Sequence, residues 1–242
     1  MSSIKGQAKV AGLLYLLASI PAFFAWIYVP NKLIVTGDAT ATANRVRASE
    51  TLLRLGIGSE LFCLILFIFV VLALYQLFKP VSEKHASAMA ILLLISLPIS
   101  FLAVVNEIAA LIVVGGPSFL SAFNQPQLDS LAYLFFRLHS QGLVVAQIFW
   151  GLWLFPFGVL VIRSGFIPRF LGYLLFIAGV GYIANSLAAL LLPAQRDLVA
   201  RFADILQMAE LPIMFWLLIW GTRDQPSHKQ ISDRLLLNNL PN

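Results

Sequence analysis

The sequence predicts an all-α membrane protein, a polytopic bundle of about six transmembrane helices with both ends in the cytoplasm. Of its 242 residues, 60% are hydrophobic and 11% charged, less than half of the charged share of an ordinary soluble domain. Six stretches are long and apolar enough to cross about 30 Å of hydrocarbon as helices. None of them shows the two-residue alternation of a barrel strand. Lipid is therefore expected to surround most of the chain.

The first two spans are separated by a predicted outer helix. The apolar run over 10–29 follows Lys5 and Lys9, as a signal-peptide core would, but at about twenty residues it exceeds the usual core length. No small-x-small cleavage site closes the run, and so we interpret it as a retained span. Thr36-Gly37-Asp38 then predicts a turn and an N-cap, followed by an amphipathic helix over 39–54 and a second span over 55–78.

The third and fourth spans are expected over 86–114 and 142–162. Pro117 and Asn124-Gln125-Pro126 predict a loop between them, and Asp129 is expected to cap a helical extension of the fourth span over 130–139. Gly151, Pro156 and Gly158 predict a kink or close packing in this span. A tight inner turn with Gly165, Pro168 and Gly172 is expected to follow.

The fifth and sixth spans are expected over 170–192 and 202–221. The sixth carries Asp204, Gln207 and Glu210, which leaves five spans with an outer C-terminus as the alternative. Pro212 is expected to loosen the helix beside Glu210. Residues 1–223 are predicted to form one domain, and 224–242 a polar cytoplasmic tail.

The orientation follows from the distribution of lysine and arginine, which are enriched in cytoplasmic loops. With the N-terminus inside, nine basic residues lie in inner segments and six in outer segments, and the inner loops are the shorter ones. The inner residues are Lys5, Lys9, Lys79, Lys84, Arg163, Arg169, Arg223, Lys229 and Arg234, and the outer ones Lys32, Arg45, Arg47, Arg54, Arg196 and Arg201.

Composition and missing motifs exclude several functions. The net charge of +5 is spread along the chain, which argues against a nucleic-acid partner. The single cysteine, Cys63, permits neither an intrachain disulfide nor a cysteine metal cluster. With His85 and His228 on the inner side, a three-histidine site around His139 is excluded, and no H-E-x-x-H, G-x-S-x-G or P-loop is present. We predict no cofactor and no dedicated metal site, and an enzyme is the less favoured class.

Polar residues inside the spans are unevenly placed. An ionisable side chain near the bilayer centre costs about 2.5–3.5 kcal/mol, so such residues are expected to face an interior. They gather in the outer halves of spans two to six, and we predict one outward-facing pocket there. Its candidate ligand-binding residues are Glu60, Asn106, Glu107, Arg137, His139, Asn185, Gln207 and Glu210, with Asp204 at its edge.

Three interpretations of these residues stay open. Arg137 paired with Glu107 would simply lock two helices together. A ligand or ion pocket would use the same acids with Arg137 as the counter-charge. His139 with Glu107 and Glu210 would offer a mixed set of ligands for a divalent cation.

Two segments resemble a known family. Thr36-Gly37-Asp38-Ala39, Thr42, Asn44 and Leu53-Arg54-Leu55-Gly56 resemble the start of the bacterial domain-of-unknown-function 4386 family. The run from Ile148 to Trp153, with Pro156, Gly158, Arg163 to Pro168 and Leu171-Gly172, resembles its most recognisable segment. The resemblance extends over about Lys9 to Gly221 and implies a multi-pass protein of the bacterial inner membrane, with no activity attached.

The leading functional hypothesis is a membrane protein that binds a small molecule or an ion from the outer side. The alternatives are a proton-coupled secondary transporter and an intramembrane enzyme. Membrane lipid is an expected partner in every case, while the sequence indicates no particular protein partner.

Overall fold

The computed structural model describes residues 4–222, and within that range the chain is helical with no strand. Six helical segments in the described range are long and apolar enough to cross a membrane, which confirms the predicted fold class. They cover Ile4–Leu33, Glu50–Phe78, Glu83–Val114, Gln125–Ser164, Arg169–Leu191 and Arg196–Ile219. The predicted tail, 224–242, lies outside the described residues.

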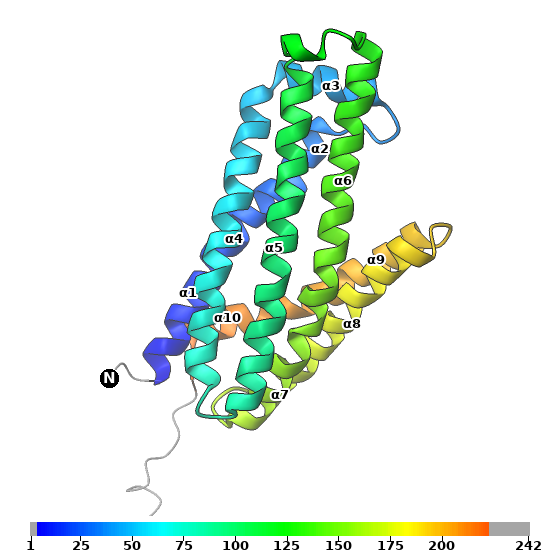
Figure 1. Cartoon of the computed structure of the whole chain (residues 1–242). Helices are drawn as coiled ribbons and strands as arrows, with labels where there is room; N and C mark the ends of the chain where they lie inside the picture. The colour runs from blue at the N-terminus through cyan, green and yellow to red at the C-terminus, as the bar shows by residue number, and fades with distance from the viewer. Residues whose placement is uncertain (1–3, 223–242) are drawn as a thin grey trace, which may run out of the picture.

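Several segments are divided into shorter helices (Figure 1). The helices are α1 Ile4–Phe23, η1 Phe24–Tyr28, α2 Val29–Leu33, α3 Ala39–Ala48, α4 Glu50–Phe78, α5 Glu83–Val114, η2 Ser118–Leu120, α6 Gln125–Leu152, α7 Leu154–Ser164, α8 Arg169–Leu191, α9 Arg196–Gln207, η3 Met208–Glu210 and α10 Leu211–Ile219.

The first span contains a π-helical turn, η1, in which the Val29 N–H donates to the Phe24 carbonyl. Pro30 follows directly, and its missing N–H leaves the Trp26 carbonyl without its usual helical donor. A π-turn inserts one extra residue and re-aims the side chains around it. Here it directs Trp26 toward the bundle interior, where it lines two cavities described below.

The predicted outer helix forms but ends early. Asp38 caps it as expected, its side chain accepting a hydrogen bond from the Ala41 N–H at 2.8 Å. The helix stops at Ala48, because Ser49 leaves helical geometry, and α4 begins at Glu50. The chain therefore turns between α3 and α4, where the prediction had one helix up to residue 54.

The start of α6 corrects the assignment of its cap. The N-cap is Asn124, which forms a capping box with Gln127. Asp129 lies one turn inside the helix, and its carboxylate accepts a hydrogen bond from the Arg47 guanidinium of α3 at 2.9 Å. The missed signal was the capping box itself, because Asn followed three residues later by Gln marks a helix start.

Glycines bring α6 and α7 against α8, as predicted. A Cβ at Gly158 would lie 2.8 Å from the Gly172 carbonyl oxygen, and one at Gly151 would lie 2.7 Å from the Gly179 carbonyl oxygen. Neither pair leaves room for a side chain. The helix also bends at Trp153, between α6 and α7, because Pro156 cannot donate to the Leu152 carbonyl.

The sixth span also changes character where a proline was expected to loosen it. α9 ends at Gln207, Met208–Glu210 form a 3₁₀ turn, and α10 begins at Leu211 with Pro212 in its first turn. This tightening places Glu210 at the junction of two helices.

The two ends of the bundle differ. α10 finishes beside the start of α1, where Gly221 lies against the Lys5 backbone; we call this the terminal end. The opposite, distal end carries α2, α3 and η2, and in Figure 1 it rises well beyond the connection from α8 to α9. At 1.5 Å per residue, the 40-residue segment Gln125–Ser164 is about 60 Å long, so its distal part extends beyond the hydrocarbon. Which end faces the cytoplasm stays a prediction.

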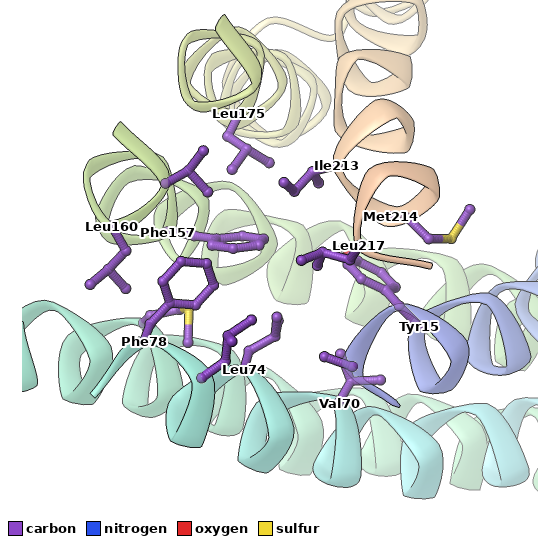
Figure 2. Close-up of a cluster of buried hydrophobic side chains, with 14 of the residues drawn as sticks. Tyr15, Val70, Leu74, Phe78, Phe157, Leu160, Leu175, Ile213, Met214 and Leu217 are labelled. Atoms are coloured by element: carbon purple, nitrogen blue, oxygen red, sulfur yellow. The ribbon is translucent and has the colours of Figure 1, made fainter. Parts of the chain in front are cut away.

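The apolar core has two parts. At the terminal end Tyr15, Phe78, Phe157, Leu175 and Leu217 come together from five helices (Figure 2). A second cluster toward the distal end joins α2, α3, α4, α5 and α6, and includes Leu33, Val46, Leu53, Val104 and Phe136. The buried ionisable groups lie among the residues of this second cluster.

Candidate functional site

Three ionisable side chains meet inside the distal half of the bundle. Glu60 comes from α4, Glu107 from α5 and His139 from α6, with exposed fractions of 1%, 5% and 7%. One potential ligand atom from each lies within 4.8 Å of the others. The His139 Nε2 is 3.0 Å and 3.2 Å from the two carboxylate oxygens of Glu60. We call Glu60, Glu107 and His139 the distal triad.

Two members of the triad, Glu107 and His139, lie at the floor of a pocket. This distal pocket has a volume of about 300 Å³ and is lined by Glu107 and His139 at its buried end. Exposed polar residues, Asn31, Thr36 and Arg137, line its outer part. A solute that enters from the distal end therefore reaches the triad without crossing the apolar core.

Glu107 has an unsatisfied atom at this floor. Its Oε2 is buried and has no hydrogen-bond partner among the described residues. A buried carboxylate oxygen without a partner costs several kcal/mol unless a proton or a cation reaches it. The site thus contains two acids and one histidine, and its buried Glu107 oxygen would be stabilised by a proton or a cation.

Two predicted residues lie at the edge of this arrangement. Arg137 lines the distal pocket but is exposed, and it forms no ion pair with an acid in the described part of the chain. The structure thus contains no Arg137–Glu107 ion pair, which was one of the interpretations left open by the sequence. Asn106 is half-buried, and its side chain donates to the Leu102 carbonyl of its own helix instead of reaching the triad.

The remaining predicted residues lie elsewhere in the bundle. Asn185 donates to the Gln147 side chain at 2.9 Å and so links α8 to α6. Glu210 accepts a hydrogen bond from the Tyr15 hydroxyl. Asp204, Gln207 and Glu210 line a second cavity, of about 580 Å³, together with Gln147. We call it the central cavity.

The prediction of one pocket that unites Glu60, Glu107 and Glu210 is consequently wrong. Glu210 is nine residues from the terminal end of α10, or about 14 Å along the helix, whereas Glu60 is about 27 Å from the terminal end of α4. The difference in depth separates them. The sequence suggested His139, Glu107 and Glu210 as possible metal ligands. In the structure the third residue of this group is Glu60, not Glu210.

Comparisons with known proteins show the family of this chain. Residues 10–221 match the family described as Domain of unknown function (DUF4386). The chain belongs to this family. A DUF4386 assignment names no activity, and a relative from Archaeoglobus fulgidus is an "Uncharacterized protein", 28% identical over 163 residues that cover 66% of this chain and 80% of the relative. No solved structure matches. The family resemblance is confirmed, and this DUF4386 protein is an integral, multi-pass membrane protein with no function attached by its relatives.

Several residues of this DUF4386 protein's cavities were not predicted from the sequence. Tyr15, Trp26 and Tyr182 all line cavity walls, yet aromatic residues in an apolar helix look like ordinary packing or interface residues. Only Trp26 carried a signal, because it lies four residues before Pro30. The Arg47–Asp129 pair joins residues 82 positions apart and could not be paired without coordinates.

The donor set of the distal triad suits a first-row divalent metal ion. Imidazole nitrogen and carboxylate oxygen are ligands of Zn²⁺, Mn²⁺ and Fe²⁺, and bond lengths near 2.0–2.2 Å place ligand atoms about 3–4 Å apart. The His139–Glu60 pair already has this spacing at 3.0 Å. The three ligand atoms lie within 4.8 Å of one another, so the side chains would have to move by about 1 Å to bind one metal ion together. Three ligands leave a coordination position open toward the distal pocket.

Proposed function

We propose that this protein binds a first-row divalent metal ion at the distal triad and receives it through the distal pocket. The observation that supports the proposal is the meeting of Glu60, Glu107 and His139, each from a different helix and each buried, around an oxygen that lacks a partner. With a neutral histidine the triad carries a charge of about −2, which one divalent ion balances. Two carboxylates whose oxygens lie within 4.8 Å repel each other unless a proton or a cation balances them.

The proposal includes a membrane and an orientation. The membrane is a bacterial inner membrane, the two ends of the chain lie in the cytoplasm, and the distal pocket opens to the outside. The excess of lysine and arginine at the terminal end supports this orientation. The triad would then lie near the outer edge of the hydrocarbon, within reach of ions in the external solution. Membrane lipid surrounds the bundle, and no nucleic acid is involved.

The test is metal binding by the purified, full-length chain, prepared in detergent without a polyhistidine tag. After treatment with a chelator, Zn²⁺ and Mn²⁺ are titrated and the bound metal is counted by mass spectrometry. One equivalent is expected. His139→Ala and Glu107→Gln should each weaken binding by about 100-fold, because each removes one of three ligands.

His85→Ala is the matched control, because His85 lies at the terminal end and pairs with Ser82, away from the triad. It should leave the affinity unchanged. If the wild-type chain takes up no metal, or if His139→Ala and Glu107→Gln both bind metal as tightly as His85→Ala does, the proposal is wrong.

A further inference from the structure

The central cavity lies among all six spans. Its wall includes Trp26 from η1, Phe67 from α4, Leu97 from α5, Trp150 from α6 and Tyr182 from α8, while η3 and the end of α9 provide the rest. A volume of about 580 Å³ is within the range of small-molecule sites, about 300–1,000 Å³. The terminal-end core closes it on one side, since Trp153 belongs both to that core and to the cavity wall.

The charge of this cavity has one sign. Two carboxylates, Asp204 and Glu210, line it, and none of its described lining residues is a lysine, arginine or histidine. Glu210 is positioned by the Tyr15 hydroxyl. Asp204 is exposed, whereas Glu210 is half-buried. Glu210 is therefore the acid that can attract a cation and repel an anion in a region of lower dielectric.

The aromatic wall indicates the kind of cation. Trp26 stacks on Trp150 with ring centroids 5.0 Å apart, and Tyr182 meets Trp150 edge to face at 6.3 Å. A weakly hydrated cation over such rings is stabilised by their quadrupoles, by about 2 kcal/mol or more when water is excluded. Leu64, Leu93 and Leu97 on the same cavity offer apolar contacts for the substituents of that cation.

We propose that the central cavity binds a lipophilic organic cation, with Glu210 as its counter-charge and Trp26 and Trp150 against its apolar or aromatic groups. This site goes beyond the distal metal site and does not depend on it. The buried amide nitrogen of Gln207, which has no hydrogen-bond partner among the described residues, lies on the same wall. It is available to a polar substituent of the ligand.

The test compares two ions of the same shape and opposite charge. Binding of tetraphenylphosphonium and of tetraphenylborate is measured by calorimetry on the full-length chain in lipid nanodiscs, with empty nanodiscs subtracted. The phosphonium ion is expected to bind at least about tenfold more tightly than the borate. Glu210→Gln should weaken phosphonium binding by about tenfold or more and abolish the discrimination, and Trp150→Leu should weaken it several-fold.

Two controls isolate the cavity. Glu50→Gln removes an exposed carboxylate that pairs with Arg54 and should leave phosphonium binding unchanged. Glu107→Gln removes one of the proposed metal ligands and should also leave phosphonium binding unchanged. A failure of the metal proposal can therefore be distinguished from a failure of the cavity proposal. Equal affinity for both ions would show that the cavity takes any apolar molecule, and it would overturn the proposal.

A second measurement uses the wild-type chain alone and covers the case in which Glu210→Gln does not fold. A hydrophobic carbodiimide modifies carboxyl groups inside membrane proteins, and mass spectrometry locates the modified residues. Phosphonium at saturation should protect Glu210 from modification, while Glu107 should react at the same rate with or without it. Unprotected Glu210 contradicts the proposal.

Discussion

Two buried acids at the distal end differ in their hydrogen-bond partners. Asp129 is 2% exposed and receives hydrogen bonds from Arg47 on α3 and from Gln125, one turn earlier on its own helix. Glu107 is nearly as buried, yet its Oε2 has no partner in the described part of the chain. The first acid is satisfied by protein alone and joins two helices. The second still lacks a proton or a cation to balance it, and the proposed metal ion would supply that charge.

The difference between a partly buried and an exposed ion pair leads to a prediction on stability. Arg47→Ala should destabilise the protein by about 1–3 kcal/mol, because it leaves the buried Asp129 carboxylate without its charged donor. Arg54→Ala is the matched control: Arg54 and Glu50 have exposed fractions of 62% and 48%, and such a pair contributes less than about 1 kcal/mol. Thermal unfolding in detergent measures both. Equal losses of stability would mean that Arg47 does not hold α3 against α6.

At the scale of elements, the helices could be predicted and their pairing could not. Apolar length alone located all six spans, because hydrocarbon forces every backbone N–H and C=O into a helix. The contacts of Glu60 with His139 depend instead on the relative height and rotation of α4 and α6, which packing decides. The sequence grouped Glu210 with Glu60 and Glu107 in one pocket, because apolar length alone fixes neither the rotation of a span nor the height of one span against another.

The close packing of α6 and α7 against α8 at glycine residues could be predicted from the sequence. The Gly158–Gly172 contact permits backbones of α7 and α8 to touch, and a side chain at either position would meet a carbonyl oxygen closer than 3 Å. Gly151 and Gly179 repeat the arrangement further along the same two segments. Small residues of this kind let helices gain dispersion contacts where lipid offers no hydrophobic driving force.

Two glycine-to-alanine variants test this close packing. Gly158→Ala should lower stability by about 1–3 kcal/mol, because its Cβ would lie 2.6 Å from the Phe176 ring and 2.8 Å from the Gly172 oxygen. Gly58→Ala is the control, since a Cβ there meets nothing within 4 Å; in the interior of α4 it should be neutral or add about 0.5–1 kcal/mol. The unfolding temperature should fall for Gly158→Ala and should stay unchanged or rise for Gly58→Ala. A stabilising Gly158→Ala would show that α7 and α8 are not in close contact.

At the scale of the whole molecule, the two proposed sites lie at different depths of one bundle. The distal triad opens through its pocket to the distal end, while the central cavity lies near the middle, at the level of Glu210. Trp26 lines both the distal pocket and the central cavity, because the π-turn before Pro30 aims it between them. The side of the membrane from which the distal pocket is reached therefore depends on which end of the bundle faces the outside.

The single cysteine makes this orientation measurable. Cys63 is fully buried, and Cys63→Ala supplies a background without cysteine. Into it Ser121→Cys is introduced at the distal end or Lys84→Cys at the terminal end, both at exposed positions. With a membrane-impermeant maleimide on intact spheroplasts, Ser121→Cys should be labelled and Lys84→Cys only after permeabilisation, since basic loops stay in the cytoplasm. The reverse pattern would invert the bundle and turn the distal pocket toward the cytoplasm, so that the metal ion bound there would have to come from inside the cell.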